Sequence, residues 1–185
     1  MGADRLPEVL DATYECLTRY GVRRTTMDDI ASTMGVSRSA VYQYVRNKDD
    51  AFQRLAARLH ERALERARRA AAARDVPYSE RVRGVLAAKL DLALRLAGDS
   101  PHTAELLDEK DRRFGSLCAT FGADLRGLLV GVFTEAGTAD GVGAAEAADV
   151  CLALVVGLED VPGARRLLAP AADALVSGLL GEERR

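Results

Sequence analysis

Two short helical patterns separated by a single glycine occupy residues 25–48, TTMDDIASTMGVSRSAVYQYVRNK. Thr26 and Asp29 have the hydroxyl-x-x-acid spacing of a capping box, in which the hydroxyl accepts one free backbone amide and the carboxylate accepts another. This spacing predicts a short helix over residues 27–34.

The glycine between the two patterns, Gly35, can adopt a positive φ and so allows a sharp turn. Ser37 can then cap a second helix over residues 38–45. Apolar side chains are spaced to face one another across the pair: Ile30, Ala31, Met34, Val36, Val41 and Val45. The order of small residue, glycine and β-branched residue is that of a helix-turn-helix. Because the pair has no core of its own, we expect another helix to pack behind it.

The rest of the chain is also helical in pattern, and the sequence predicts an all-α fold. Apolar residues at spacings of three and four predict a first helix over residues 7–20 and a long helix that starts near Lys48. Further helices are expected at residues 80–97, 103–113, 114–136, 144–158 and 170–180, with Pro170 in the first turn of the last one. These helices and breaks predict an N-terminal three-helix domain (1–48), a connector helix (49–76) and a C-terminal helical domain (77–185).

Charge is distributed unevenly along the chain although the net charge is only −2. Residues 1–74 contain 14 Lys and Arg against 10 Asp and Glu, whereas residues 75–185 contain 12 against 18. A basic surface is the electrostatic requirement for binding nucleic acid. The asymmetry therefore favours the N-terminal part as the place for such a partner.

The sequence predicts a cytoplasmic protein without a membrane partner. The first residues alternate charged and apolar types, unlike a signal peptide. The longest apolar run, residues 150–158, is about half as long as a membrane-spanning helix. The three cysteines, Cys16, Cys118 and Cys151, are far apart and odd in number, so we expect buried, reduced thiols.

Enzymatic and metal sites are not predicted. The two histidines, His60 and His102, have no partner at the spacing of a catalytic or metal-binding motif. The acids Asp108, Glu109 and Asp111 follow His102, but neighbouring acids on one helix point to different faces. We therefore expect no catalytic residue, no cofactor and no metal.

If the apolar face of the second helix packs inside the domain, its polar side chains remain on the surface, where they can contact a partner. Arginine can read the two acceptors of guanine, glutamine can read adenine, and serine suits either base. Tyrosine hydroxyls and a lysine ammonium suit phosphate oxygens. Side chains of these kinds are Arg38, Ser39, Gln43, Tyr42, Tyr44 and Lys48. The alternative is an ordinary polar face of a helical hairpin.

The stretch resembles the N-terminal DNA-binding domain of the TetR family of transcriptional regulators over about residues 5–60. The matching parts are Tyr20-Gly21-Val22, Thr25-Thr26-Met27, Ile30-Ala31, Met34-Gly35-Val36-Ser37 and the run VYQYVRNKD at residues 41–49. This sequence departs from the family where many relatives have glycine near Ala40 and phenylalanine at Val45. The departures leave the identity of the bases open.

The resemblance implies a second helix in the major groove, with Arg38, Ser39 and Gln43 on base edges. It places Thr26, Tyr42, Tyr44 and Lys48 on phosphates. It also implies a homodimer on a palindromic operator in double-stranded DNA, joined by a four-helix interface from the last two helices. The interface residues expected on these helices are Ala148, Cys151, Leu152, Val155, Leu175, Val176 and Leu179.

Members of the family are usually repressors that leave DNA when a small molecule enters the C-terminal domain. By that likeness we expect an effector of unknown identity. The residues selected as pocket walls, because aromatic rings with a few polar atoms can orient a ligand, are Tyr78, His102, Phe114, Cys118, Phe121 and Phe133. The alternative is a helical ligand-binding or protein-interaction protein with weak or lost DNA binding.

Overall fold

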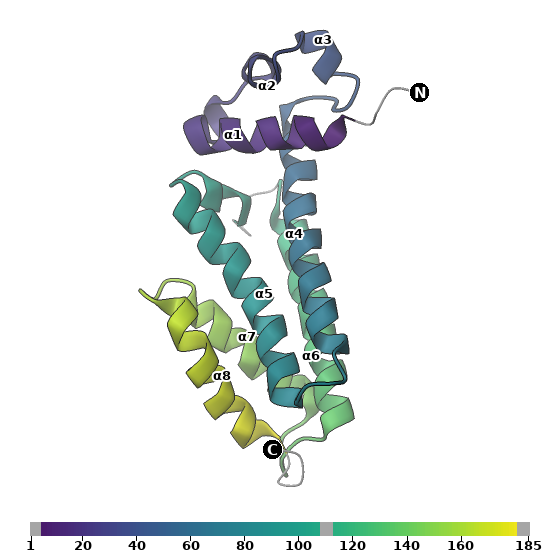
Figure 1. The fold of residues 1–185 in the computed structure, drawn as a ribbon, viewed down its shortest axis with the longest axis vertical. Helices are drawn as coiled ribbons and strands as arrows, with labels where there is room; N and C mark the ends of the chain where they lie inside the picture. Colours follow the sequence, from purple (N-terminus) through teal and green to yellow (C-terminus); the bar gives the residue numbers. More distant parts are fainter. Residues whose placement is uncertain (1–4, 108–112, 181–185) are drawn as a thin grey trace. The chain divides into compact units, whose positions relative to one another are not determined.

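The computed structural model describes residues 5–107 and 113–180 (Figure 1). The chain forms two compact units. Unit 1 comprises Met1–His60 and Arg95–Ala119, and unit 2 comprises Glu61–Leu94 and Thr120–Arg185. The division into 1–48, 49–76 and 77–185 follows helix ends rather than contacts, and it stays a prediction.

Unit 1 begins with three helices: α1 (Leu6–Arg24), α2 (Met27–Met34) and α3 (Arg38–Val41). The first parts of α4 (Lys48–Ala72) and α6 (Gly115–Ala136), the end of α5 (Tyr78–Asp99) and a short 3-10 helix, η1 (Thr103–Leu107), complete it. Helix α1 is longer than predicted because its helical pattern resumes after Gly21, where φ is 76°. The expected stop at this glycine is a kink.

The helix-turn-helix is held by a shared apolar core. Val9, Ala12 and Cys16 of α1 pack against Ile30 and Ala31 of α2. The same cluster includes Met27, Val41, Val45 and Ala51, with Met34 and Val36 partly buried against it. The prediction that a third helix packs behind the pair is confirmed. Removing these side chains from water is the main force that holds helices this short.

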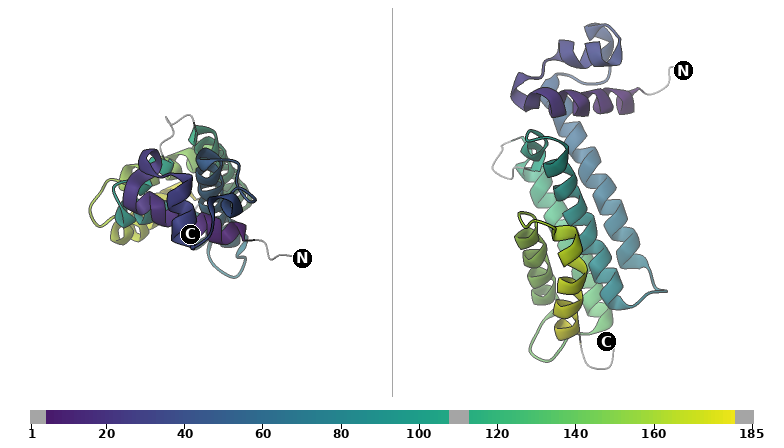
Figure 2. Two further views of the ribbon diagram at one scale, coloured as in Figure 1. Left: turned by 90° about the horizontal axis from the view of Figure 1, so that it is seen from above. Right: turned by 60° about the vertical axis from the view of Figure 1, so that its left-hand side comes forward.

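Unit 2 contains the rest of α4, α5 and α6 together with α7 (Ala144–Leu158) and α8 (Ala164–Leu179). Helices α7 and α8 lie side by side (Figure 2). The buried guanidinium of Arg81 on α5 donates to the Ala71 carbonyl at 2.8 and 2.5 Å and to Glu135 of α6 at 3.0 Å. This contact ties three helices together. Within the described ranges, extended pairing is limited to one bridge between Thr138 and Leu180.

Two further predicted helix boundaries are wrong. Helix α8 starts at Ala164, which places Pro170 inside it instead of in its first turn. Proline has no N–H to donate to the carbonyl four residues earlier, which is that of Arg166. Both Pro170 and Arg166 are exposed, so water can donate to that carbonyl instead. The helix expected at residues 103–113 is a 3-10 turn over Thr103–Leu107, and Asp108, Glu109 and Asp111 lie outside the described residues.

Helix α6 is long and apolar enough to cross a membrane by length and composition alone. Its most apolar window has a mean hydropathy of 1.4, and 33% of that window is buried inside the protein. A core helix of a soluble protein passes the same test. The sequence predicted this helix at residues 114–136 but not its membrane-like composition, because charged residues such as Asp124 and Arg126 interrupt its apolar runs.

The cysteines are free and buried, as predicted. Burial raises the pKa of Cys151 to about 12, so its thiol is protonated near neutral pH. We expect iodoacetamide at pH 8 to leave Cys151 unmodified in the folded chain and to alkylate it in denaturant. Peptide mass spectrometry measures both states. Rapid modification of Cys151 without unfolding would contradict its place in the core.

Candidate nucleic-acid interface

The turn between α2 and α3 has the predicted chemistry. Thr26 caps α2: its Oγ1 accepts the Asp29 amide at 3.2 Å, while the Asp29 carboxylate accepts the Thr26 amide at 2.8 Å. Gly35 ends the helix in the left-handed region with φ 66°. The Ser37 hydroxyl accepts the Ala40 amide at 3.3 Å and caps α3. The capping box, the glycine turn and the second cap are confirmed.

Helix α3 is shorter than predicted. Its α-helical part ends at Val41, and residues 42–44 form a turn. The amides of Gln43 and Tyr44 bond to carbonyls three residues earlier, at 3.3 and 3.0 Å, which is the 3-10 pattern. The predicted helix over residues 38–45 is therefore one α-helical turn followed by a tighter one.

The side chains assigned to DNA differ in exposure. Thr26, Arg38, Ser39, Tyr42 and Gln43 are exposed. Tyr44 is half-buried and packs against the apolar cluster of the helix-turn-helix, so much of its ring serves the core. Lys48 is also half-buried. Their roles toward DNA stay predictions.

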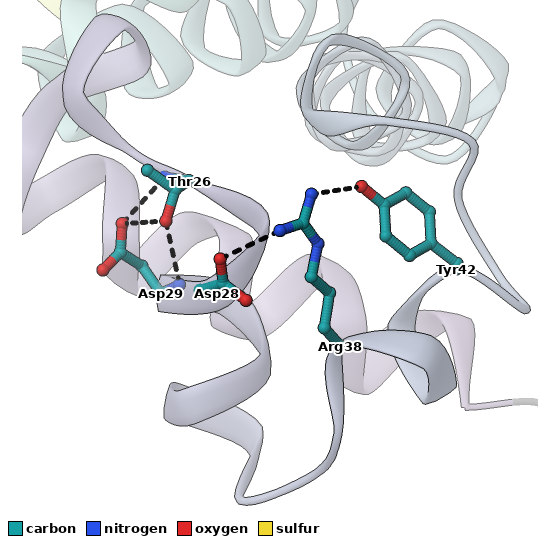
Figure 3. A network of polar contacts seen from close by, with 5 residues as sticks. All are labelled: Thr26, Asp28, Asp29, Arg38 and Tyr42. Carbon is teal, nitrogen blue, oxygen red and sulfur yellow. Dashed lines mark hydrogen bonds and ion pairs between the residues drawn. The ribbon is translucent and has the colours of Figure 1, made fainter.

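Arg38 is held on both sides (Figure 3). Its Nη1 donates to Asp28 Oδ2 at 3.1 Å, and its Nη2 donates to the Tyr42 hydroxyl at 3.0 Å. The guanidinium carbon lies 5.5 Å from the centroid of the Tyr42 ring. The hydrogen bond to Tyr42 and the charge of Asp28 raise the pKa of Arg38 above its ordinary value. This arginine therefore stays charged.

A family model described as "Bacterial regulatory proteins, tetR family" matches residues 9–55, which contain α2, α3 and most of α1. Residues 9–55 therefore match the DNA-binding part of the TetR family. An uncharacterized HTH-type transcriptional regulator of Bacillus subtilis, YhgD, is 29% identical over 91 residues. These are 49% of this chain and 47% of that protein, so the match spans about half the length of the relative.

Solved structures match nearly the whole chain. SmeT, the repressor of a multidrug efflux pump of Stenotrophomonas maltophilia, matches in its triclosan complex with a TM-score of 0.78 and 19% identity. The match covers 97% of this chain and 93% of that one. FadR of B. subtilis with stearoyl-CoA matches with a TM-score of 0.71 and 19% identity, over 93% and 98% of the two chains. Identities this low show a shared fold.

The link from α3 to α4 depends on Asp50, an acid that the sequence analysis did not single out. Asp50 is buried, and its carboxylate accepts the Arg46 amide at 2.9 Å and Arg54 Nε at 3.1 Å. Burial opposes its charge, but these bonds hold the pKa of Asp50 below its ordinary value. Asn47 Oδ1 accepts the Asp50 amide at 2.8 Å. The Asn47-x-x-Asp50 spacing, like that of the first capping motif, was the available signal.

Lys48 joins the two ends of the helix-turn-helix. Its ammonium donates to the carbonyl oxygens of Arg23 at 2.9 Å and Thr25 at 3.0 Å. These carbonyls lie at the negative C-terminal end of α1, where a cation is favoured. Lys48 therefore has a structural function within unit 1 in addition to the predicted phosphate contact.

The residues expected at a dimer interface lie mainly on the inner face of the last two helices. Ala148, Cys151, Val155, Val176 and Leu179 are buried within the protomer, and Leu152 and Leu175 are half-buried. The outer side of these helices carries other apolar side chains: Val150, Val156 and Leu167 are exposed, with Val156 at 56%. Val161, in the turn between the two helices, is exposed as well. Five of the seven predicted residues are therefore core residues of the protomer, and the role of the set in a dimer stays a prediction.

The six residues expected around an effector are divided between the units. His102, Phe114 and Cys118 belong to unit 1, whereas Tyr78, Phe121 and Phe133 belong to unit 2. In unit 1, Cys118 Sγ lies 3.9 Å from the buried His60 Nε2. In unit 2, the Arg81 guanidinium lies 5.0 Å from the Tyr78 ring centroid.

Open cavities lie elsewhere in each unit. One in unit 1, of about 370 Å³, lies between α4 and α6 near Gln53 and Ser116. One in unit 2, of about 340 Å³, is lined by α4, α5 and α6 and includes Arg81 and Glu135. None of the six predicted pocket residues lines either cavity. Among the described residues, no group of three metal-binding side chains is present.

Proposed function

We propose that this chain is a cytoplasmic, sequence-specific transcriptional regulator of the TetR family. It acts as a repressor, binds a palindromic operator as a homodimer and leaves DNA when a small molecule binds. The observation that carries the proposal is that α2 and α3 bury their apolar side chains and expose polar ones. Their apolar residues are used in the core, whereas Arg38, Ser39, Tyr42 and Gln43 are exposed on one short recognition segment.

A second copy of the chain is needed because one recognition segment reads only a few base pairs. The outer face of α7 and α8 supports a homodimer. It exposes Val150, Val156 and Leu167, and small residues such as Ala153 and Gly157 would allow a partner helix to approach closely. Two α7–α8 pairs would form a four-helix interface across a two-fold axis and present two recognition segments to successive major grooves.

The effector part of the proposal is supported by what two structural relatives bind. SmeT was solved with triclosan and FadR with stearoyl-CoA, and both share the fold of this chain. Unit 2 has a cavity of about 340 Å³, a volume within the range of small-molecule sites. An effector would release DNA if it bound more tightly to a conformation with the wrong spacing of the recognition segments.

The test is a binding titration of the purified chain against duplex DNA from immediately upstream of its own gene. A scrambled duplex of the same composition is titrated beside it at two salt concentrations. Tight binding to the native fragment, weakened by salt, is the expected result. Equal weak binding to both duplexes, and no enrichment from a random duplex library, would favour the alternative of a ligand-binding protein without DNA recognition.

Lys48→Ala should weaken binding to every DNA sequence. Loss of one phosphate contact in each protomer reduces the slope of log affinity against log salt by about one per half-site. Loss of the two carbonyl contacts should also lower the free energy of unfolding by about 1–3 kcal/mol. Titrations at several salt concentrations and thermal unfolding measure the two effects.

Lys89→Ala is the matched control, since Lys89 pairs with Glu159 at 2.5 Å and both residues belong to unit 2. It should leave the salt slope unchanged. If Lys48→Ala lowers the melting temperature but leaves the salt slope unchanged, Lys48 stabilises the fold and does not contact a phosphate.

A further inference from the structure

An acidic side chain lies on the surface that the proposed function turns toward DNA. Asp28, in the first turn of α2, has a side chain that is 66% exposed, and its partner Arg38 is 53% exposed. A carboxylate on such a surface is repelled by phosphates. The helix does not depend on it for capping, because Thr26 and Asp29 form the capping box.

Asp28 instead links the two helices through Arg38. The ion pair of 3.1 Å joins residues ten positions apart, on opposite sides of the Gly35 turn (Figure 3). The hydroxyl of Tyr42, one turn further along, accepts a hydrogen bond of 3.0 Å from the other terminal nitrogen of the same guanidinium. Arg38 is thus fixed from α2 on one side and from its own segment on the other.

A fixed guanidinium is better prepared to read a base than a free one. Arginine has five N–H donors, and the contacts with Asp28 and Tyr42 engage two of them. The others remain for the two acceptors of guanine. A long side chain that is already ordered loses less conformational entropy when it binds.

We propose that Asp28 is a positioning residue for DNA recognition, which holds Arg38 ready for guanine and disfavours unrelated sequences. This inference rests on the proposed function, since it requires the recognition segment to enter the major groove. On the correct site the carboxylate remains paired with an arginine that is bound to a base. On other sequences Arg38 gains no base contact, while the charge of Asp28 still repels the phosphates.

The test compares two duplexes of equal length. One is the sequence that the wild-type chain enriches from a random duplex library, and the other is its scrambled form. Asp28→Ala should lower the ratio of selected to scrambled affinity by about tenfold. Affinity for the scrambled duplex should stay constant or rise, because a negative charge is removed from the interface. Melting temperature is measured in parallel.

Two further variants isolate the mechanism. Glu15→Ala removes the same charge from an exposed ion pair on α1, with Arg19 at 2.6 Å, and should leave the ratio unchanged. In an Arg38→Ala background, Asp28→Ala should have no further effect on the ratio, because Asp28 acts through Arg38. Asp28→Asn keeps an acceptor without the charge and should give an intermediate ratio. If the Asp28→Ala variant folds poorly, Asp28→Asn replaces it in the comparison.

An unchanged ratio in Asp28→Ala overturns the inference. So does a full additional loss in the Arg38→Ala background. A parallel fall in affinity for both duplexes, with a lower melting temperature, would show a merely structural residue and would also overturn it. If the wild-type chain enriches no sequence at all, the proposed function fails, and the role of Asp28 fails with it.

Discussion

Gln43→Ala is expected to reduce affinity for the preferred operator by about 1–3 kcal/mol in each half-site, or about 2–6 kcal/mol for a homodimer. Gln43 is exposed on the turn after α3, and its amide can bond both acceptor and donor groups of adenine. The loss should fall mainly on the preferred sequence, because scrambled DNA offers no matching base. Paired titrations of the selected and scrambled duplexes measure it.

Gln53→Ala is a matched control for this variant. Gln53 is an exposed glutamine on α4, within the same unit but outside the recognition segment. Its replacement should change neither affinity. Equal weakening of both duplexes by Gln43→Ala would mean that Gln43 contacts the backbone or supports the fold, and that base reading belongs to Arg38 and Ser39.

Local chemistry made the helix-turn-helix predictable from the sequence. The contacts of Thr26 with Asp29, the left-handed Gly35 and the Ser37 cap each involve residues a few positions apart. Such interactions depend on spacing alone. The apolar cluster of α1, α2 and α3 could also be predicted, because their apolar residues recur at helical spacing.

Contacts between distant residues could not be predicted in the same way. The Asp28–Arg38 pair crosses a turn, and the Lys48 contacts connect residues more than twenty positions apart. Pro170 was misplaced because exposure to water, rather than sequence order, decides whether a helix tolerates proline. None of these features has a characteristic local spacing.

The sequence does not distinguish which face of α7 would meet a partner in the proposed dimer. Its inner residues, including Cys151 and Val155, and its outer residues, including Val150 and Val156, are all apolar. Periodicity identifies an apolar face but not whether it packs within the protomer or against a second copy. The more strongly apolar face proved to be the core, which leaves the outer one for the proposed dimer.

Val156→Lys is expected to convert the proposed homodimer into a folded monomer. The side chain is 56% exposed in the protomer, so lysine there should cost the fold little. In a four-helix interface two lysines would face one another near the two-fold axis, where burying unpaired charges is strongly unfavourable. Operator affinity should fall by roughly a thousandfold or more toward non-specific binding, because the two recognition segments are no longer joined.

Light scattering and operator titration on the same sample measure both effects, and helical content by circular dichroism establishes that the variant is folded. Val156→Thr retains the branched shape without a charge and should remain dimeric. If Val156→Lys stays dimeric and binds the operator normally, the interface lies on another face. If the wild-type chain is itself monomeric yet sequence-specific, each protomer must recognise its site alone, and exposed apolar residues such as Val150 and Leu167 need a different partner.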